Sequence, residues 1–566
     1  MRPLGSQSVY GKNCAAASSS RLATLAGIRA MEQGGTAADA CVAMAAVLNV
    51  VEPTSTGIGG DAFCLFWDER EQRVSAVNGS GRSPVALSLE GLARAGIAVR
   101  ADRIADPCHA VNVTVPGAAA AWCDVLERHG RLGLAAALAP AIALAEEGFA
   151  VGEVTAHKWQ KAEPLLRAKG AAGLLLPDGR APAAGAVFRN PALAQTLRTV
   201  SAGGKRAFYE GEIAEALVAS LRRHGGVLEL VDLRQHVSTF EPPVSTTLRG
   251  AWRVYECAPN GQGLAALLAL NIVECFEWEA LPTAQQWHVA VEAVRLAFAD
   301  VTYHVADPAH PSAAAAVAPA ALLDKRYART RAALIDPAAA AGSFGRGDGM
   351  HSSDTVYLCA ADREGNCCSF INSNYMGFGT GIECQGHGFT LQNRGNNFYC
   401  GPDERHPNRL QPGKRPYHTI IPGLVTRLAP GGREALHCAF GVMGGFMQPQ
   451  GHLQVLLRML LQVCPRPRPP LLFSPLLLLV QGAAPQEALD AGRFCVAWET
   501  GRELLHLEEG VDPEVVAELR RLGHAVVETR GWDRLLFGKG QVIERLTNGT
   551  YRAGSDVRSD GCALGS

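Results

Sequence analysis

A threonine at the end of a loose linker is the feature of this sequence whose chemistry is easiest to infer. Residues 336–353 include PAAAAGSFGRGDGMHSS, a Pro-, Ala-, Gly- and Ser-rich stretch whose composition is typical of a linker. The pattern changes at Asp354-Thr355, where TVYLCAAD, a turn REGN and CCSFIN predict two strands of a buried hairpin. Thr355 therefore stands at the first position of a predicted strand.

A threonine hydroxyl is a weak nucleophile unless a base lies beside it. When the backbone amine of the same residue is freed, an N-terminal threonine supplies both the nucleophile and the base. An enzyme of this kind is made as a precursor and is cut just before the threonine. We therefore predict cleavage between Asp354 and Thr355, with Thr355 as nucleophile and amine base. The alternative is that Asp354-Thr355 is an ordinary start of a strand.

Elements on both sides of the linker must position this threonine. The segment Ser18–Met31 predicts a helix, because serines suited to capping open it and two glycines follow it. The next segment, TAADACVAMAAVLNVV from Thr36, is apolar nearly all round and predicts a buried helix. The Gly-rich bend at Ser55–Asp68 leads into a strand, and the turn EREQ returns the chain as a hairpin. Further predicted elements are Ala-rich helices from Pro116 to about Ala150 and strands at Gly388–Leu391, His418–Val425 and Leu436–Phe440.

Composition excludes several classes of function. The chain has 566 residues, with 53 Lys plus Arg against 54 Asp plus Glu, so it lacks the basic excess of a nucleic-acid-binding protein. The N-terminus has no apolar core of signal-peptide length, and the apolar run Leu471–Val480 is half of what a bilayer requires. The 16 cysteines show no zinc-site spacing and suit a reducing compartment. We expect a cytoplasmic protein with neither a nucleic-acid nor a membrane partner.

Five separated blocks of the chain resemble the gamma-glutamyltranspeptidase family, in the same order. They are GGTAADACVAMAAVLNVVEPTSTGIGGDAF, DTVYLCAADREGNCCSFIN, KRPYHTIIP, GVMGGFMQPQ and GSDVRSDGCALG. The resemblance implies an α/β (α+β) fold, a four-layer αββα sandwich of the N-terminal-nucleophile hydrolase type. It also implies two fragments, residues 1–354 and 355–566, that stay associated as one intertwined unit. It implies no metal and no organic cofactor.

Several residues match functional positions of that family. Thr355 matches the nucleophile, and Ser373 matches a second hydroxyl residue placed beside it. Gly444 and Gly445 match the two glycines whose N–H groups stabilise the tetrahedral oxyanion, a role that glycine suits because it permits close backbone approach. The simpler alternatives are a structural turn at Gly444-Gly445 and a serine that ends a strand at Ser373.

Other positions depart from the family pattern. The family's adjacent aspartates, the second of which holds the substrate ammonium, are replaced by Asn396 and Asn397 in LQNRGNNF. An amide supplies no countercharge, so recognition of a free ammonium should weaken. A pocket asparagine of the family falls at Tyr375. We include both Asn397 and Tyr375 among the substrate-binding candidates.

Three further substrate-binding candidates follow from the same comparison. A serine pair of the family matches His418 and Thr419, and His418 is either a pocket donor or a packed strand residue. Arg82, in GSGRSP, is the candidate for the carboxylate-binding arginine, although it lies a residue or two out of step with the pattern. A solvated hairpin arginine is the alternative for Arg82.

The resemblance implies an autoprocessed N-terminal-threonine amidohydrolase or acyltransferase. The first hypothesis is a gamma-glutamyltransferase or glutathione hydrolase-like enzyme that cleaves gamma-glutamyl-type amides such as glutathione through an acyl-enzyme. The second is an acylase for small carboxylate-bearing amides that lack an alpha-amino group, as Asn397 would allow. The third is a catalytically silent scaffold of the same fold. Its partners would be a small-molecule amide substrate and the two fragments of its own chain.

One segment is out of character with the family. Between Met459 and Ala484 the chain reads MLLQVCPRPRPPLLFSPLLLLVQGAA, which separates VLLRML from PQEALDAGRFC. Both belong to regions that are nearly contiguous in the family. We interpret the segment either as a tolerated Pro-rich loop or as a fault in the gene model.

Overall fold

The interior of the molecule is formed by two stacked antiparallel sheets. This computed structural model describes residues 7–342, 354–461, 482–499 and 501–566. The six-stranded sheet has the order β20-β2-β11-β12-β3-β4, and the seven-stranded sheet has the order β1-β19-β18-β14-β13-β10-β9. Their bounds are β20 Cys562–Gly565, β2 Ala15–Ser18, β11 Asp354–Ala361, β12 Cys367–Tyr375, β3 Asp61–Asp68 and β4 Arg73–Asn78 for the first sheet, and β1 Val9–Gly11, β19 Tyr551–Ser555, β18 Lys539–Arg545, β14 Glu434–Met443, β13 Gly423–Leu428, β10 Trp252–Glu256 and β9 Val244–Leu248 for the second.

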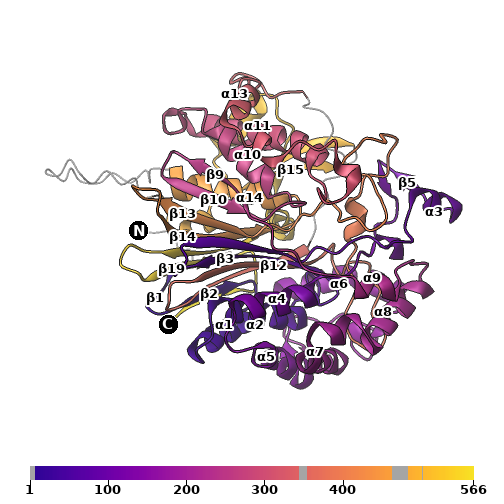
Figure 1. Ribbon diagram of the computed structural model, residues 1–566. Coiled ribbons are helices and arrows are strands. Elements are labelled where there is room, and N and C mark those ends of the chain that lie inside the picture. Colours follow the sequence, from indigo (N-terminus) through magenta and orange to yellow (C-terminus); the bar gives the residue numbers. More distant parts are fainter. Residues whose placement is uncertain (1–6, 343–353, 462–481, 500) are drawn as a thin grey trace.

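Helices cover the outer face of each sheet, so the layers follow the predicted αββα order (Figure 1). Against the six-stranded sheet lie α1 Arg21–Glu32, α2 Ala37–Val51 and α4 Ala118–His129. α5 Leu134–Glu147 and α7 Pro191–Tyr209 pack on the outer side of these helices, with α6 Glu153–Lys169 and α8 Glu212–Arg223 nearby. On the other side lie α10 Gly263–Val273, α11 Thr283–His304 and α14 Met447–Leu456, with α13 Lys325–Ala332 and α16 Pro513–Arg521. A small third sheet, β15 Phe494–Glu499, β16 Arg502–Glu508 and β17 Val526–Thr529, packs beside these helices.

The buried helix predicted from Thr36 is confirmed. All residues of α2 are buried, and Thr36 caps it by accepting from the N–H of Ala38 and Asp39. Helix α1 begins at Arg21, later than predicted, because Ser18 pairs in β2.

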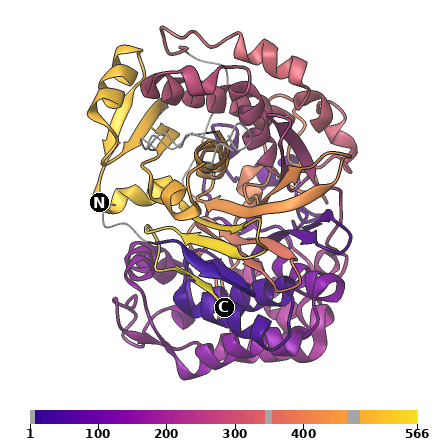
Figure 2. The same ribbon diagram turned by 90° about the vertical axis from the view of Figure 1, so that its left-hand side faces the viewer.

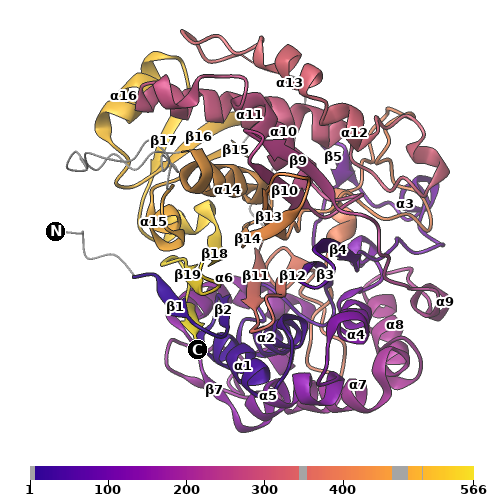
Figure 3. The same ribbon diagram turned by 60° about the vertical axis from the view of Figure 1, so that its left-hand side comes forward.

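The predicted hairpin of β11 and β12 lies in the middle of its sheet. It is flanked by β2 on one side and by β3 on the other. Figure 3 shows β14 of the second sheet above β11, and the inner faces of the two sheets meet there through side chains such as Tyr357, Ile371 and Ala439. The start of β11 is therefore held between two sheets.

Two of the three later strand predictions need correction. Gly388–Leu391 forms no strand, since Gly386 and Gly388 have positive φ values of 81° and 70° that turn the chain back on itself. The strand predicted from His418 begins only at Gly423, because the N–H of His418 donates to Asn260 and not to a neighbouring strand. The strand at Leu436–Phe440 is confirmed within β14.

Segments from before and after the linker alternate within both sheets. β20 pairs with β2, and β1 pairs with β19, so the last strands of the chain lie beside the first (Figure 2). β11 and β12 likewise pair with strands from the first hundred residues. A cut at Asp354-Thr355 would leave the two parts joined through both sheets.

Two remaining features concern apolar segments. Among the described residues, the structure contains no helix that is long and apolar enough to cross a membrane. The segment Met459–Ala484 lies mostly outside the described residues, but its two ends are described. The N–H of Ala483 donates to the carbonyl of Arg458 at 2.9 Å, so the chain leaves and returns at one point.

This geometry predicts that residues 462–481 can be deleted, joining Leu461 to Gly482. Because the ends already meet, the change in loop-closure entropy is small, and we expect the melting temperature to move by no more than about 3 °C. Circular dichroism on heating, with the full-length protein as control, measures this. Aggregation, or a loss of about 10 °C or more, would show that the segment supports the fold.

Candidate active site

Thr355, at the start of β11, lies opposite a β-bulge that Ser373 and Asn374 form on β12. Asp354 pairs with Tyr375 and Val356 pairs with Asn372, so the register shifts by one residue across Thr355. A bulge re-aims a side chain that regular pairing would fix, and bulges are common next to active sites. Thr355 is fully buried, and its hydroxyl is directed at the opposite strand, β12.

The Ser373 hydroxyl connects the candidate nucleophile to the backbone that precedes it. Its Oγ lies 3.0 Å from Thr355 Oγ1, and it donates to the carbonyl oxygen of Asp354 at 3.0 Å. The N–H of Tyr375 donates to the same Oγ at 2.9 Å and fixes its position. One side chain therefore contacts both the hydroxyl and the carbonyl that a self-cleavage reaction would join.

The Asp354 carboxylate is held by a lysine from a distant helix. Lys158, on α6, forms an ion pair with it. Burial lowers the pKa of Lys158, while Asp354 opposes that shift. A second buried pair, Lys539 with Glu52 at 2.9 Å, lies close enough to influence the pKa of Lys158. These charges fix the residue just before Thr355.

Gly444 and Gly445 form the turn between β14 and α14. Their φ values of 133° and 59° lie in a region that other residues rarely adopt. Neither N–H donates to an acceptor in the part of the chain that the structure describes, although both residues are buried. Gly444 lines a cavity of about 650 Å³ together with Asp354 and Lys158. Gly444 thus lies in the cavity beside Asp354, where a free N–H could stabilise a charge that develops on the backbone.

An arginine that sequence analysis missed lies beside the same hydroxyl. Arg394 is fully buried, and it donates to Thr419 Oγ1 at 2.5 Å and to Ser373 Oγ at 3.3 Å. Its guanidinium lies over the ring of Tyr375, 4.6 Å from the centroid. Arg394 thus contacts two predicted site residues, the hydroxyl of Thr419 and the ring of Tyr375.

His418 is paired with a buried aspartate. Its Nδ1 accepts from the N–H of Ile420, so Nε2 carries the proton and donates to Asp61 Oδ2 at 3.0 Å. Burial lowers the pKa of His418 and raises the pKa of Asp61 to about 6. Asp61 is also the cross-strand partner of Ser373. His418 therefore supports the site as a neutral donor behind Ser373.

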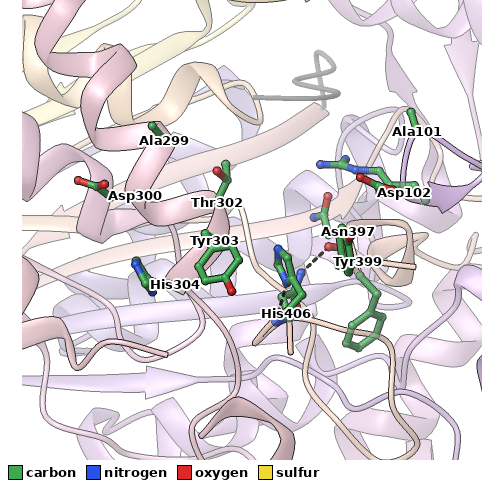
Figure 4. A pocket seen from close by; sticks show the side chains of 13 residues that line it. Ala101, Asp102, Ala299, Asp300, Thr302, Tyr303, His304, Asn397, Tyr399 and His406 are labelled. Carbon is green, nitrogen blue, oxygen red and sulfur yellow. Dashed lines mark hydrogen bonds between the residues drawn. The ribbon is translucent and has the colours of Figure 1, made fainter. Parts of the chain in front are cut away.

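Asn397 lines a pocket of about 330 Å³ (Figure 4). Its side chain is 4% exposed, and neither amide atom has a hydrogen-bond partner among the described residues. Arg394 and Asn397 begin and end the 3₁₀ helix η5, where side chains three apart point the same way. Asn397 lies in the same short helix as Arg394, three residues along the chain from the arginine that contacts Ser373. The neighbouring Asn396 instead donates to the carbonyl of Ile104.

Arg82 is not in this group. Its guanidinium donates to Asp307 at 2.7 Å and to the carbonyl of Gly413 at 3.1 Å, and its side chain is 39% exposed. Arg394 is the arginine next to Thr355. It stands in LQNRGNNF, the same block that contains Asn397. The sequence signal that could have indicated Arg394 is that it is the one charged residue of this block, all of whose helical residues are buried.

One other cluster has the composition of a metal site. His288, Glu292 and His524 are buried, with ligand atoms within 4.8 Å of one another. His288 Nδ1 and His524 Nε2 are hydrogen-bonded at 2.8 Å, and Glu292 pairs with Arg295 at 2.6 Å. Since the guanidinium already supplies positive charge, the cluster fits a hydrogen-bond network between α11 and the segment after α16.

Comparison with known proteins agrees with this geometry. Residues 23–566 match the sequence profile described as gamma-glutamyltranspeptidase. The chain is 34% identical to the glutathione hydrolase-like YwrD proenzyme of Bacillus subtilis, with 99% of each chain covered. It is 32% identical to the oxamate amidohydrolase proenzyme of Klebsiella pneumoniae, covering 96% of this chain and 97% of the relative.

Solved structures agree with the sequence relatives. Cephalosporin acylase from Bacillus halodurans superposes with a TM-score of 0.87 at 38% identity, over 100% of this chain and 98% of that one. The match of the profile covers almost the whole chain and includes both sides of the linker. The chain is therefore a hydrolase of the gamma-glutamyltranspeptidase family.

Proposed function

We propose that this protein is a self-cleaving amidohydrolase whose nucleophile is Thr355. The observation that carries the proposal is the position of Ser373 Oγ, 3.0 Å from both Thr355 Oγ1 and the carbonyl oxygen of Asp354. The names of the relatives as proenzymes support a precursor that is cut. The contacts at Ser373 and the available N–H groups of Gly444 and Gly445 argue against a silent scaffold.

Self-cleavage begins when Thr355 Oγ1 attacks the carbonyl carbon of Asp354. The Oγ–C bond forms, the C–N bond of the peptide breaks, and the hydroxyl proton passes to the departing nitrogen. Ser373 polarises the carbonyl under attack, and Lys158 holds Asp354 in place. Water then hydrolyses the ester and leaves residues 1–354 with a new carboxylate and residues 355–566 with a free amine.

In the cleaved enzyme the amine of Thr355 is the base for its own hydroxyl. The hydroxyl attacks the carbonyl of an amide substrate, and the oxyanion that forms accepts from the N–H groups of Gly444 and Gly445. The tetrahedral intermediate expels the amine with a proton. Water or an acceptor amine then resolves the acyl-enzyme.

The pocket favours the second substrate hypothesis, an acyl group that carries a carboxylate but no ammonium. Asn397 presents a neutral amide where an ammonium would need a negative charge. Arg394, the buried charge nearest to Ser373, is positive and would repel an ammonium. Relatives named for acylase and oxamate amidohydrolase activities support this choice.

Purified wild-type protein should therefore give two bands on a denaturing gel, with sizes that correspond to residues 1–354 and 355–566. Thr355→Ala should give one full-length band because it has no nucleophile, and Thr355→Ser should cleave more slowly than the wild type. N-terminal sequencing of the smaller band identifies the cut. A wild-type chain that stays whole on long incubation would favour the silent scaffold.

Substrate choice can be tested with glutaryl- and gamma-glutamyl-4-nitroanilide, which differ by one ammonium group. We expect the wild type to prefer the glutaryl donor, and we expect Asn397→Asp to shift the ratio of kcat/KM towards the gamma-glutamyl donor by about tenfold or more, since it adds a buried countercharge. Asn397→Leu, of similar size and without charge, is the control. An equal shift with Asn397→Leu would show that charge is not the cause.

A further inference from the structure

Arg394 is a buried cation whose own protein does not neutralise it directly. The guanidinium is fully buried, and it forms no ion pair with a carboxylate of the described residues. Its two hydrogen bonds go to the hydroxyls of Thr419 and Ser373, both uncharged. Asp61 acts on it only through space, while burial lowers the pKa of Arg394 to about 10. The side chain therefore remains charged at neutral pH.

A buried guanidinium of this kind calls for an anion. Removing a charge from water is costly unless a partner and hydrogen bonds offset the loss. The guanidinium has five N–H donors, and Arg394 directs only two of them to protein acceptors. Its Nε has no partner among the described residues. Two other buried arginines show the contrast, since Arg493 pairs with Asp556 and Arg558 with Glu508.

The position of Arg394 sets where that anion would lie. Ser373 Oγ is 3.3 Å from Arg394 Nη2 and 3.0 Å from Thr355 Oγ1, so one hydroxyl separates the charge from the nucleophile. Each carbon of an extended acyl chain adds about 1.3 Å, the projection of a C–C bond of about 1.5 Å on the chain axis. A negative group at Arg394 is therefore only a few bonds from a carbonyl under attack by Thr355. The ring of Tyr375 covers one face of the guanidinium and leaves binding to its edge.

We propose that Arg394 binds the carboxylate of the acyl donor, and that the preferred donors are short half-amides of dicarboxylic acids with fewer than four carbons between the carboxylate and the scissile carbonyl. This proposal rests on Thr355 as the nucleophile. Departure of Asp354 after cleavage frees the face of Ser373 that its carbonyl occupies in the uncut chain. The planar edge of Arg394 then meets a carboxylate in the geometry that such pairs prefer.

The test compares donors within each variant, so that a loss of folded protein affects both donors equally. Processed wild type, Arg394→Gln and Arg394→Lys are assayed with succinyl-, adipyl- and butyryl-4-nitroanilide; butyryl is the neutral analogue of succinyl. For Arg394→Gln we expect kcat/KM for the succinyl donor to fall about 100-fold more than for the butyryl donor, mainly through KM. Arg394→Lys should lose about tenfold, because it keeps the charge without the planar fork. The wild type should prefer succinyl to adipyl.

A fall of the same size for succinyl and butyryl donors would overturn the proposal and make Arg394 a structural residue. A wild type that prefers adipyl would also overturn it, because the anion would then be bound farther away. If the processed wild type hydrolyses none of the donors, the proposed reaction is wrong. Anion binding at Arg394 is then tested separately, by the effect of succinate on the melting temperature. Succinate should then raise the melting temperature of wild type and not of Arg394→Gln, with butyramide as control; equal shifts in both proteins would contradict anion binding at Arg394.

Discussion

The contact between Thr355 and Ser373 across two adjacent strands is the constraint on which the site depends. It requires β11 and β12 to pair in one register. If one strand slipped by one residue, the hydroxyls of Thr355 and Ser373 would lie on opposite faces of the sheet. The bulge at Ser373 and Asn374, opposite Thr355, interrupts the pairing only at this end and leaves the rest of the ladder regular. β2 and β3 hold the pair from both sides, and α2 and the second sheet cover its faces. The surrounding layers thus fix a geometry that two strands alone would not maintain.

Several charges buried around this contact have partners within the protein. Asp354 is held by Lys158, Lys539 by Glu52, and Asp61 by the neutral imidazole of His418. Each of these groups has a partner within the protein, so its burial is offset. Arg394 differs, because its contacts are hydroxyl groups and an aromatic ring. Arg394 thus brings a positive charge without a carboxylate contact to the place where a substrate would meet Thr355.

The alternation of strands explains how such a chain tolerates a cut near its middle. Strands from both sides of the linker are neighbours in each sheet, and β20 and β19 close the sheets against β2 and β1. The ladder hydrogen bonds that join the two parts do not depend on the covalent link at Asp354. The new amine at Thr355 would therefore stay where the peptide bond was, beside Ser373 and the turn at Gly444-Gly445.

The sequence by itself determined the hairpin of β11 and β12 and the buried helix α2, because both follow from local periodicity. The layered fold and the choice of Thr355 as candidate nucleophile followed from motifs in a fixed order along the chain. The helix start at Ser18 and the strand at Gly388–Leu391 were wrong, since strand pairing and positive φ values depend on contacts distant in sequence. Only the tertiary structure decided which arginine lies beside Ser373. Arg82 faces Asp307 and Arg394 faces Ser373, and no spacing along the chain distinguishes two arginines whose partners lie 225 and 21 residues away.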